Sequence, residues 1–229
     1  MPSMPDEIKP TRTEVPSQGT FPSRTLIFDF DGTIADTLSA IIRLVNEHAK
    51  EFNIKPLADT DVDELRGMSN LEIIKKYKVP LVKVPYLVLR AQKELNQRIG
   101  EMSLFPGVKE LVLDLKRRGI RLGILTSNSR ENVQKFLRAQ VLDVFDFIHA
   151  EQNFFGKNWA LLHLLKKFNL KKEEVIYVGD EVRDIEACQK VNIAVIAVSW
   201  GFHRRKLLQD KLPTHLVDSP DEIRVIVSG

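Results

Sequence analysis

Short apolar runs alternate with helical periods over most of the chain, and this alternation limits the possible folds more than any other feature. The runs that resemble strands cover residues 26–30, 120–126, 147–150, 175–178 and 193–198, with a weaker one at 215–217. Near-continuous apolar runs of this length are typical of strands buried on both faces of a parallel sheet. The sequence therefore predicts an α/β fold, a doubly wound parallel sheet with a Rossmann-like core.

Helical periods fill the intervals between these runs. The apolar residues at helical spacing are Val108, Leu111, Val112 and Leu115, then Val133, Phe136 and Leu137, then Leu161, Leu164, Leu165 and Phe168. Near the C-terminus, Ser219, Pro220 and Glu222 have the spacing of a helix N-cap, a proline in the first turn and a capping-box glutamate. These helices would cover the two faces of the sheet.

Two segments depart from the alternation. Residues 1–23 are rich in proline and polar side chains without any period, which predicts a disordered tail. Residues 37–104 contain consecutive helical periods without a clear strand between them. We therefore expect a helical cap domain at 37–104, inserted into a core domain formed by residues 24–36 and 105–229.

Composition excludes several classes of protein. The 34 basic and 31 acidic residues leave a formal charge of +3 without a long single-sign stretch, which argues against a nucleic-acid partner. No apolar run reaches the ~18 residues of a membrane span. Cys188 is the single cysteine, and the five histidines lack the spacing of a linear metal motif. We expect a soluble cytoplasmic protein without a membrane partner.

Acidic residues follow the first predicted strand and a later one. Asp29 and Asp31 leave the first strand, and Gly32 permits the sharp turn after them. Asp180 follows the strand at 175–178, and Asp184 comes one helical turn later. In a parallel sheet the carboxyl ends of the strands meet at one edge, so these carboxylates should converge.

Converging carboxylates require a cation. Two like charges ~5 Å apart repel by roughly 3 kcal/mol at an effective dielectric near 20, and several such pairs would force protonation. Mg²⁺ prefers oxygen ligands, usually one or two carboxylates with water and substrate phosphate.

Thr126, Ser127 and Asn128 lie at the end of another predicted strand, where hydroxyls and free backbone amides suit a phosphate.

The motifs at these strand ends resemble those of the haloacid dehalogenase superfamily of phosphohydrolases. The matching segments are Asp29-Phe30-Asp31-Gly32-Thr33, Thr126 after an apolar strand, Lys157, and Gly179-Asp180-Glu181-Val182-Arg183-Asp184. The resemblance covers residues 24–229 and is strongest to the phosphoglycolate phosphatase-like branch, which has a helical cap after the first motif. Lys157 lacks the flanking prolines often found in relatives.

The resemblance implies a mechanism for these residues. Asp29 would be the nucleophile that forms an aspartyl phosphate, and Asp31 would act first as general acid and then as general base. Thr126 and Lys157 would stabilise the transferring phosphoryl group. Mg²⁺ would be held by Asp29, the backbone carbonyl of Asp31, Asp180 and Asp184.

Substrate contacts are expected from residues beside the catalytic ones and from the cap. Gly32, Thr33, Ser127 and Asn128 flank the predicted catalytic residues. Arg66 lies in a loop-like break between cap helices that resembles the specificity loop of capped relatives, and a guanidinium can bind a carboxylate or a second phosphate. The expected partner is a small phosphorylated metabolite, with phosphoglycolate as one candidate, and the expected assembly is a monomer or a small homo-oligomer.

Two other functions remain open at the level of sequence. A phosphosugar mutase related to the capped phosphatases would use the same catalytic residues but transfer the phosphoryl group to a sugar hydroxyl. A non-catalytic binding module would keep the fold without turnover, although such a protein has no physical reason to retain two mutually repelling acids at Asp29 and Asp31.

Overall fold

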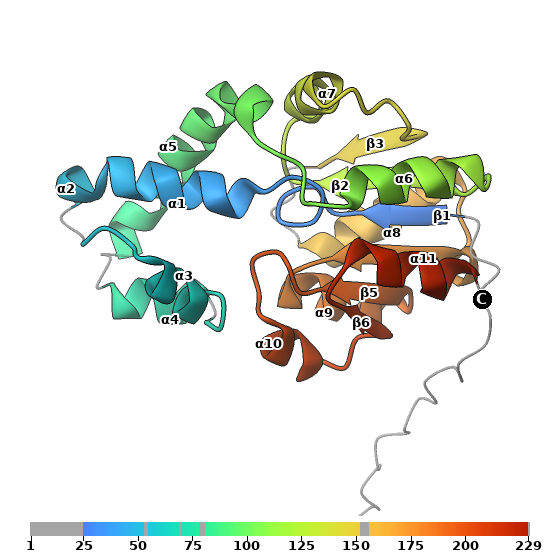
Figure 1. Cartoon of the computed structure of the whole chain (residues 1–229). Coiled ribbons are helices and arrows are strands. Elements are labelled where there is room, and N and C mark those ends of the chain that lie inside the picture. Colours follow the sequence, from blue (N-terminus) through green and yellow to red (C-terminus); the bar gives the residue numbers. More distant parts are fainter. Residues whose placement is uncertain (1–24, 53–54, 69, 78–80, 152–155, 229) are drawn as a thin grey trace, which may run out of the picture.

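The structure is a computed structural model that describes residues 25–52, 55–68, 70–77, 81–151 and 156–228. The predicted tail at residues 1–23 lies outside the described residues. Figure 1 shows a sheet with helices on both of its faces and a group of helices beside it.

All six predicted strands are present and form one parallel sheet. The strands are β1 (Thr25–Phe28), β2 (Arg121–Thr126), β3 (Phe147–Ala150), β4 (Val175–Gly179), β5 (Ala194–Val198) and β6 (His215–Val217). Their order in the sheet is β3-β2-β1-β4-β5-β6, with every neighbouring pair parallel. The predicted α/β fold class is therefore confirmed, and β1 lies between β2, which ends at Thr126, and β4, which precedes Asp180.

The register brings the ends of three strands together. Phe28, the last residue of β1, is level with Ile124 of β2 and Val178 of β4. The backbone amide of Asp29 still donates to the carbonyl of Val178 at 2.8 Å. Residues that follow β1, β2 and β4 consequently share the carboxyl edge of the sheet.

Helices cover the two faces of the sheet, and each face has its own apolar core. The first face carries α6 (Val108–Arg117), α7 (Arg130–Ala139) and α11 (Pro220–Ser228), and the second carries α8 (Lys157–Phe168), α9 (Val182–Val191) and α10 (Arg205–Gln209). Alternate residues of β1 divide between the faces: Leu26 and Phe28 pack with the first group, and Ile27 packs with the second. Cys188 of α9 is fully buried in the second core.

Local signals explain where these helices begin and end. Ser129 caps α7, because its side chain accepts a hydrogen bond from the amide of Asn132 at 3.2 Å. The helices α8 and α9 end at Asn169 and Asn192, both in the left-handed conformation that terminates a helix. The predicted helix start at Pro220 is also observed.

The described part of residues 37–103 consists of helices and their connections. The helices are α1 (Thr37–Glu47), α2 (Ala49–Phe52), α3 (Asp59–Leu65), α4 (Asn70–Lys76) and α5 (Val84–Gln97), with short 3-10 turns at Leu81–Lys83 and Ile99–Glu101. His48 contacts Glu94 at 2.9 Å, and Arg98 pairs with Glu47 at 2.8 Å, so polar contacts join the end of α1 to α5.

The chain enters and leaves this helical segment at one place. The amide of Asp36 donates to the carbonyl of Ser103 at 2.9 Å, and the amide of Phe105 donates to the carbonyl of Ile34 at 3.1 Å. The two connections therefore run side by side as a hydrogen-bonded pair. This arrangement supports an insertion, and the division into a core and a separate cap domain stays a prediction.

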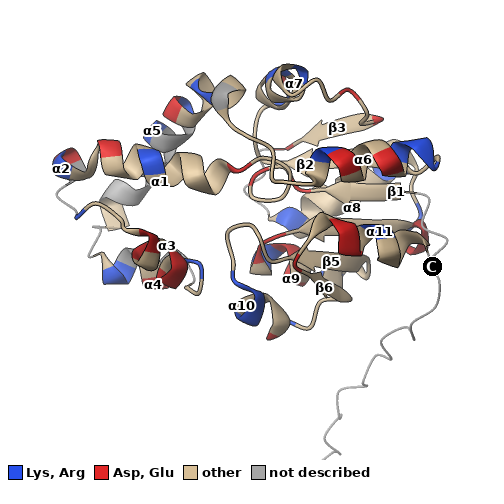
Figure 2. Cartoon of the chain, viewed as in Figure 1, with Lys and Arg blue, Asp and Glu red and all other residues tan. Residues whose placement is uncertain are grey.

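Arg66 contacts the core from the helical segment. Its Nε donates to the carbonyl of Gly201 at 2.9 Å, and its Nη2 donates to the carbonyl of Ser199 at 2.6 Å. Asp63 of α3 lies 3.6 Å from Arg204, the residue before α10. In Figure 2, acidic residues colour much of α3 and basic residues colour α10, and both signs of charge are interspersed elsewhere.

Among the described residues, no helix is both long enough and apolar enough to cross a membrane.

Candidate active site

Asp29 lies at the centre of the carboxyl edge of the sheet, directly after β1. Its side chain is buried, and Oδ1 accepts a hydrogen bond from the amide of Phe30 at 2.8 Å. Its Oδ2 forms an ion pair with Lys157. Burial raises the pKa of Asp29 to about 6, although the Lys157 ammonium opposes this rise.

Lys157 is the first residue of α8, and its ammonium contacts two carboxylates. It forms ion pairs with Asp29 and with Asp184 of α9. Burial alone would lower the pKa of Lys157, but Asp184 and Asp29 raise it overall, so the lysine stays charged. The predicted lysine is thus in the site, even without flanking prolines.

Asp180 follows β4 and is held by groups from two other segments. Its Oδ1 accepts from the hydroxyl of Thr33 at 2.7 Å, and its Oδ2 accepts from the amide of Phe202 at 2.7 Å. Burial raises the pKa of Asp180 well above its usual range, and the nearby Glu181, Asp184 and Asp29 add to this rise. Asp180 therefore needs a positive partner in order to stay ionised.

Gly32 allows the first motif to approach Asp180 closely. Its φ is +77°, in the left-handed region, and a Cβ on it would collide with the Asp180 carboxylate and the Phe202 ring. The absence of a side chain at Gly32 therefore lets its backbone pack directly against Asp180 and Phe202. Thr33 contacts Asp180 in the structure, and direct contact of either residue with substrate stays a prediction.

The cluster fits a hard divalent cation. Oxygen atoms of Asp29, Asp180 and Asp184 all lie within 4.8 Å of one another, and all three residues are buried. Lys157 offsets one of these three negative charges. The donor atoms are all oxygens, which Mg²⁺ and similar ions prefer, so the chemistry of the cluster agrees with the expected metal.

Asp31 lies beside this cluster. Burial, followed by the charge of Asp29, raises the pKa of Asp31 to about 7, while a hydrogen bond from the Asn128 side chain opposes the rise. A carboxyl group with such a pKa exchanges protons near neutral pH. Its side chain is not one of the three carboxylates described above, and metal binding through its backbone carbonyl stays a prediction.

Thr126 is the last residue of β2, and Ser127 and Asn128 follow it at the same edge. The Thr126 side chain is buried, and its Oγ1 accepts a hydrogen bond from the amide of Asn128 at 2.9 Å. Asn128 in turn accepts from the amide of Ser129 at 2.8 Å and from the side chain of Asn132 at 3.1 Å. These hydrogen bonds fix the backbone of the turn after β2.

A cavity of about 290 Å³ opens beside Asp29. Its lining includes the predicted residues Asp29, Thr126, Ser127 and Lys157. It also includes polar residues that we did not predict to contact substrate, namely Glu151, Asn158, Arg183, Glu186 and Lys190. Arg66, Asp31 and Asp180 are not part of this lining.

Arg183 is the most informative of the unpredicted residues. Its guanidinium pairs with Glu181 at 2.5 Å, and its charge opposes the rise in the pKa of both Asp29 and Asp31. Arg183, Glu186 and Lys190 follow one another at helical spacing on α9. That spacing was visible in the sequence, but it matched an ordinary exposed helix face, so it did not stand out.

The predicted residues separate into two places. The site brings together Asp29, Lys157, Asp180 and Asp184, with Asp31, Thr126 and Asn128 around them. Arg66 lies at the contact between the helical segment and the core, where it donates to two backbone carbonyls. Its predicted contact with substrate stays a prediction.

A doubly wound parallel sheet whose carboxyl edge gathers buried acids, a lysine and hydroxyls is the arrangement of a phosphoryl-transfer enzyme. The sequence profile of haloacid dehalogenase-like hydrolases matches residues 26–198. The chain belongs to this family, and it is a phosphatase.

Individual proteins agree with the family. The phosphoglycolate phosphatase of Synechococcus elongatus is 35% identical over 201 residues, which cover 87% of this chain and 95% of the relative. The pyrophosphatase PpaX of Oceanobacillus iheyensis is 26% identical, over 89% of this chain and 96% of the relative. The fold of a haloacid dehalogenase-like hydrolase from Streptococcus pneumoniae matches with a TM-score of 0.74 at 22% identity, over 89% of this chain and 98% of that one.

Proposed function

We propose that this phosphatase is a Mg²⁺-dependent phosphomonoester hydrolase that works through an aspartyl phosphate on Asp29. The observation that carries this proposal is the position of Asp29, which pairs with Lys157 and lies within 4.8 Å of oxygens of Asp180 and Asp184. Lys157 opposes the effect of burial on the pKa of Asp29 and so favours the ionised carboxylate that attacks phosphorus.

Asp29 is the nucleophile in this mechanism. Because the amide of Phe30 holds Oδ1, the carboxylate has a fixed orientation at the end of β1. An oxygen of Asp29 forms a bond to phosphorus while the bond from phosphorus to the leaving alcohol oxygen breaks. Lys157 stays charged beside it and neutralises negative charge on the phosphoryl oxygens.

Asp31 moves the protons. In its protonated form it donates to the departing alcohol, and in its ionised form it then takes a proton from the water that attacks the phosphorus of the acyl phosphate. A pKa of about 7 allows both forms near neutral pH. Inorganic phosphate leaves, and Asp29 and Asp31 return to their starting states.

The metal would be held by the carboxylates of Asp29, Asp180 and Asp184 together with the backbone carbonyl of Asp31. When bound, Mg²⁺ supplies positive charge that stabilises the transferring phosphoryl group. Thr33 and the amide of Phe202 keep Asp180 in place for this task. Thr126, with Ser127 and Asn128, donates hydrogen bonds to the phosphoryl oxygens.

A small substrate with a second anionic group, such as phosphoglycolate, is the candidate that we favour. The relative with 35% identity over 87% of this chain is a phosphoglycolate phosphatase. Arg183 and Lys190 line the cavity beside Asp29, so cationic groups are available for a carboxylate as well as a phosphate.

The experiment measures phosphate release from phosphoglycolate, an aryl phosphate and a hexose phosphate, with Mg²⁺ and with excess EDTA. We expect release that requires Mg²⁺ and is lost in Asp29→Asn, while the control Asp143→Asn at an exposed position keeps it. Full activity in EDTA would show that the reaction does not require a metal ion. Transfer of phosphate between hexose positions without net release would instead support the phosphosugar mutase, and no reaction at all would support a non-catalytic module.

A further inference from the structure

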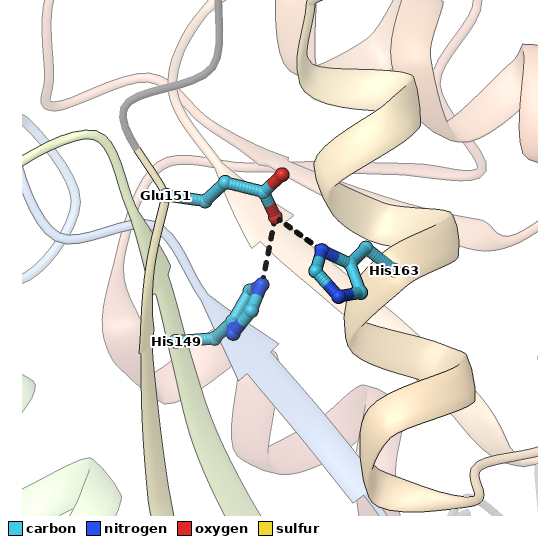
Figure 3. A group of neighbouring side chains, drawn as sticks. All are labelled: His149, Glu151 and His163. Atoms are coloured by element: carbon cyan, nitrogen blue, oxygen red, sulfur yellow. Dashed lines mark hydrogen bonds and ion pairs between the residues drawn. The ribbon is translucent and has the colours of Figure 1, made fainter.

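A second cluster of metal-binding side chains lies apart from the three aspartates. His149 is on β3, Glu151 follows that strand, and His163 is on α8. Figure 3 shows both imidazole rings directed toward one carboxylate oxygen of Glu151. Nε2 of His149 lies 2.8 Å from Oε2 of Glu151, and Nδ1 of His163 lies 3.3 Å from the same oxygen.

These separations match those of ligands around one small metal ion. Bonds of about 2.0–2.1 Å in a tetrahedral zinc site place neighbouring ligand atoms roughly 3.3 Å apart. The three ligand atoms of the cluster all lie within 4.8 Å of one another. The three side chains are therefore close enough to share one ion.

We propose that His149, Glu151 and His163 form a binding site for one Zn²⁺ or a similar transition-metal ion, distinct from the carboxylate cluster at Asp29. Two imidazoles and one carboxylate suit Zn²⁺, Co²⁺ or Ni²⁺, whereas Mg²⁺ selects oxygen ligands. The two sites would therefore bind different metal ions, because their ligand atoms differ. This proposal does not depend on the phosphatase mechanism.

Burial and exposure in the cluster also suit a metal site with an open position. His149 is buried on the sheet, with 4% of its surface exposed, while the side chain of His163 is 60% exposed. One ligand is therefore rigid, and the other is accessible to an arriving ion. Water from the exposed side completes the coordination, as in zinc sites with three protein ligands.

The position of the cluster connects it to the catalytic edge. Glu151 lines the same cavity as Asp29 and Lys157, and α8 carries both Lys157 and His163. An ion bound here ties the end of β3 to α8. We expect it to restrict movement of the helix that begins at Lys157, without direct contact with the phosphoryl group.

The test is a Zn²⁺ titration of the full chain against a chromophoric chelator, in excess Mg²⁺ so that the carboxylate cluster is occupied. We expect one Zn²⁺ per chain at this site. Loss of an outer-shell partner weakens metal binding by ~10–100-fold, so loss of a ligand in His163→Gln or Glu151→Gln should weaken it by at least about 100-fold. Co²⁺ provides a second readout, because nitrogen ligands in a tetrahedral site give a visible absorption that an all-oxygen octahedral site lacks.

His48→Gln is the matched control. His48 also contacts two glutamates, but Glu51 meets Nδ1 and Glu94 meets Nε2, so the two carboxylates lie on opposite sides of the ring. This variant should bind Zn²⁺ like the wild type. Circular dichroism of each variant checks folding, and exposed His163 is the position where substitution perturbs the fold least.

Three results would overturn the proposal. These are no stoichiometric Zn²⁺ binding by the wild type, unchanged binding in His163→Gln and Glu151→Gln, and loss of binding in Asp180→Asn instead. The last result would place zinc in the carboxylate cluster. Any of them would leave His149, Glu151 and His163 as a hydrogen-bonded group that joins β3 to α8.

Discussion

The ammonium of Lys157 pairs with the carboxylate of Asp29 across 128 positions of the chain. The fold creates this pair by placing the N-terminus of α8 beside the end of β1. Asp29 is buried and the Lys157 side chain is 13% exposed, so the ion pair offsets free energy of solvation that both groups lose in the fold.

We expect Lys157→Met to reduce kcat by about 10²–10³-fold, because it removes a cation from the transferring phosphoryl group and raises the pKa of Asp29 further. The acid limb of the kcat/KM pH profile should move to higher pH. Lys166→Met, at an exposed position of the same helix, serves as the control. Wild-type kcat in Lys157→Met would exclude this role of the lysine.

Metal binding should appear as thermal stabilisation. Mg²⁺ at 100 times its dissociation constant would add about 2.7 kcal/mol to the free energy of unfolding, because it binds the folded chain alone. Differential scanning fluorimetry should show a rise in Tm with Mg²⁺ for the wild type. Asp180→Asn and Asp184→Asn should lose most of it, and an equal rise in both variants would locate the ion elsewhere.

Asp31 should make stability depend on pH. Its folded pKa of about 7 exceeds the usual 3.8, so its stabilising effect is fully present below about pH 3.8 and is lost as the pH rises through 7. In chelator at pH 8, Asp31→Asn should therefore unfold at higher denaturant concentration than the wild type, by on the order of 2 kcal/mol. The difference should disappear near pH 4. If Asp31→Asn is still more stable than the wild type at pH 4, the ionisation of Asp31 is not the cause of the difference.

Arg66 should stabilise the contact between the helical segment and the core. Two hydrogen bonds from one guanidinium to the carbonyls of Gly201 and Ser199 are worth about 1–3 kcal/mol together. Arg66→Ala should increase hydrogen exchange of the amide of Arg204, which donates to the carbonyl of Arg66. Unchanged exchange in Arg66→Ala would show that the contact between the helical segment and the core contributes little to stability. If Arg66 also binds substrate, Arg66→Ala should raise KM more than it lowers kcat.

Much of the sheet was predictable, because a parallel strand buried on both faces is apolar at nearly every position. Element ends were less predictable. The apolar run that includes Phe30 suggested a longer first strand, but β1 ends at Phe28. Phe30 is apolar for another reason, since it packs edge-on against Phe136 with ring centroids 5.2 Å apart.

The site was predictable where its residues follow strands. Asp29, Asp180 and Asp184 follow strands of one parallel sheet, so the strand pattern predicted that they share an edge, and the structure adds that β1 and β4 are neighbours. The bonds of Arg66 to Ser199 and Gly201 depend on how two distant segments meet. The cluster of His149, Glu151 and His163 joins a strand to a helix, so no linear spacing indicated it.

The most direct test of the mechanism is a rapid-quench experiment with a substrate that carries a radioactive phosphoryl group. Acid quench in the presence of Mg²⁺ should trap label on the protein, and hydroxylamine should release it, as expected for an acyl phosphate. The label should be absent in Asp29→Asn and present in Asp143→Asn. Turnover by the wild type without any trapped label, or label that persists in Asp29→Asn, would contradict the assignment of Asp29 as the nucleophile.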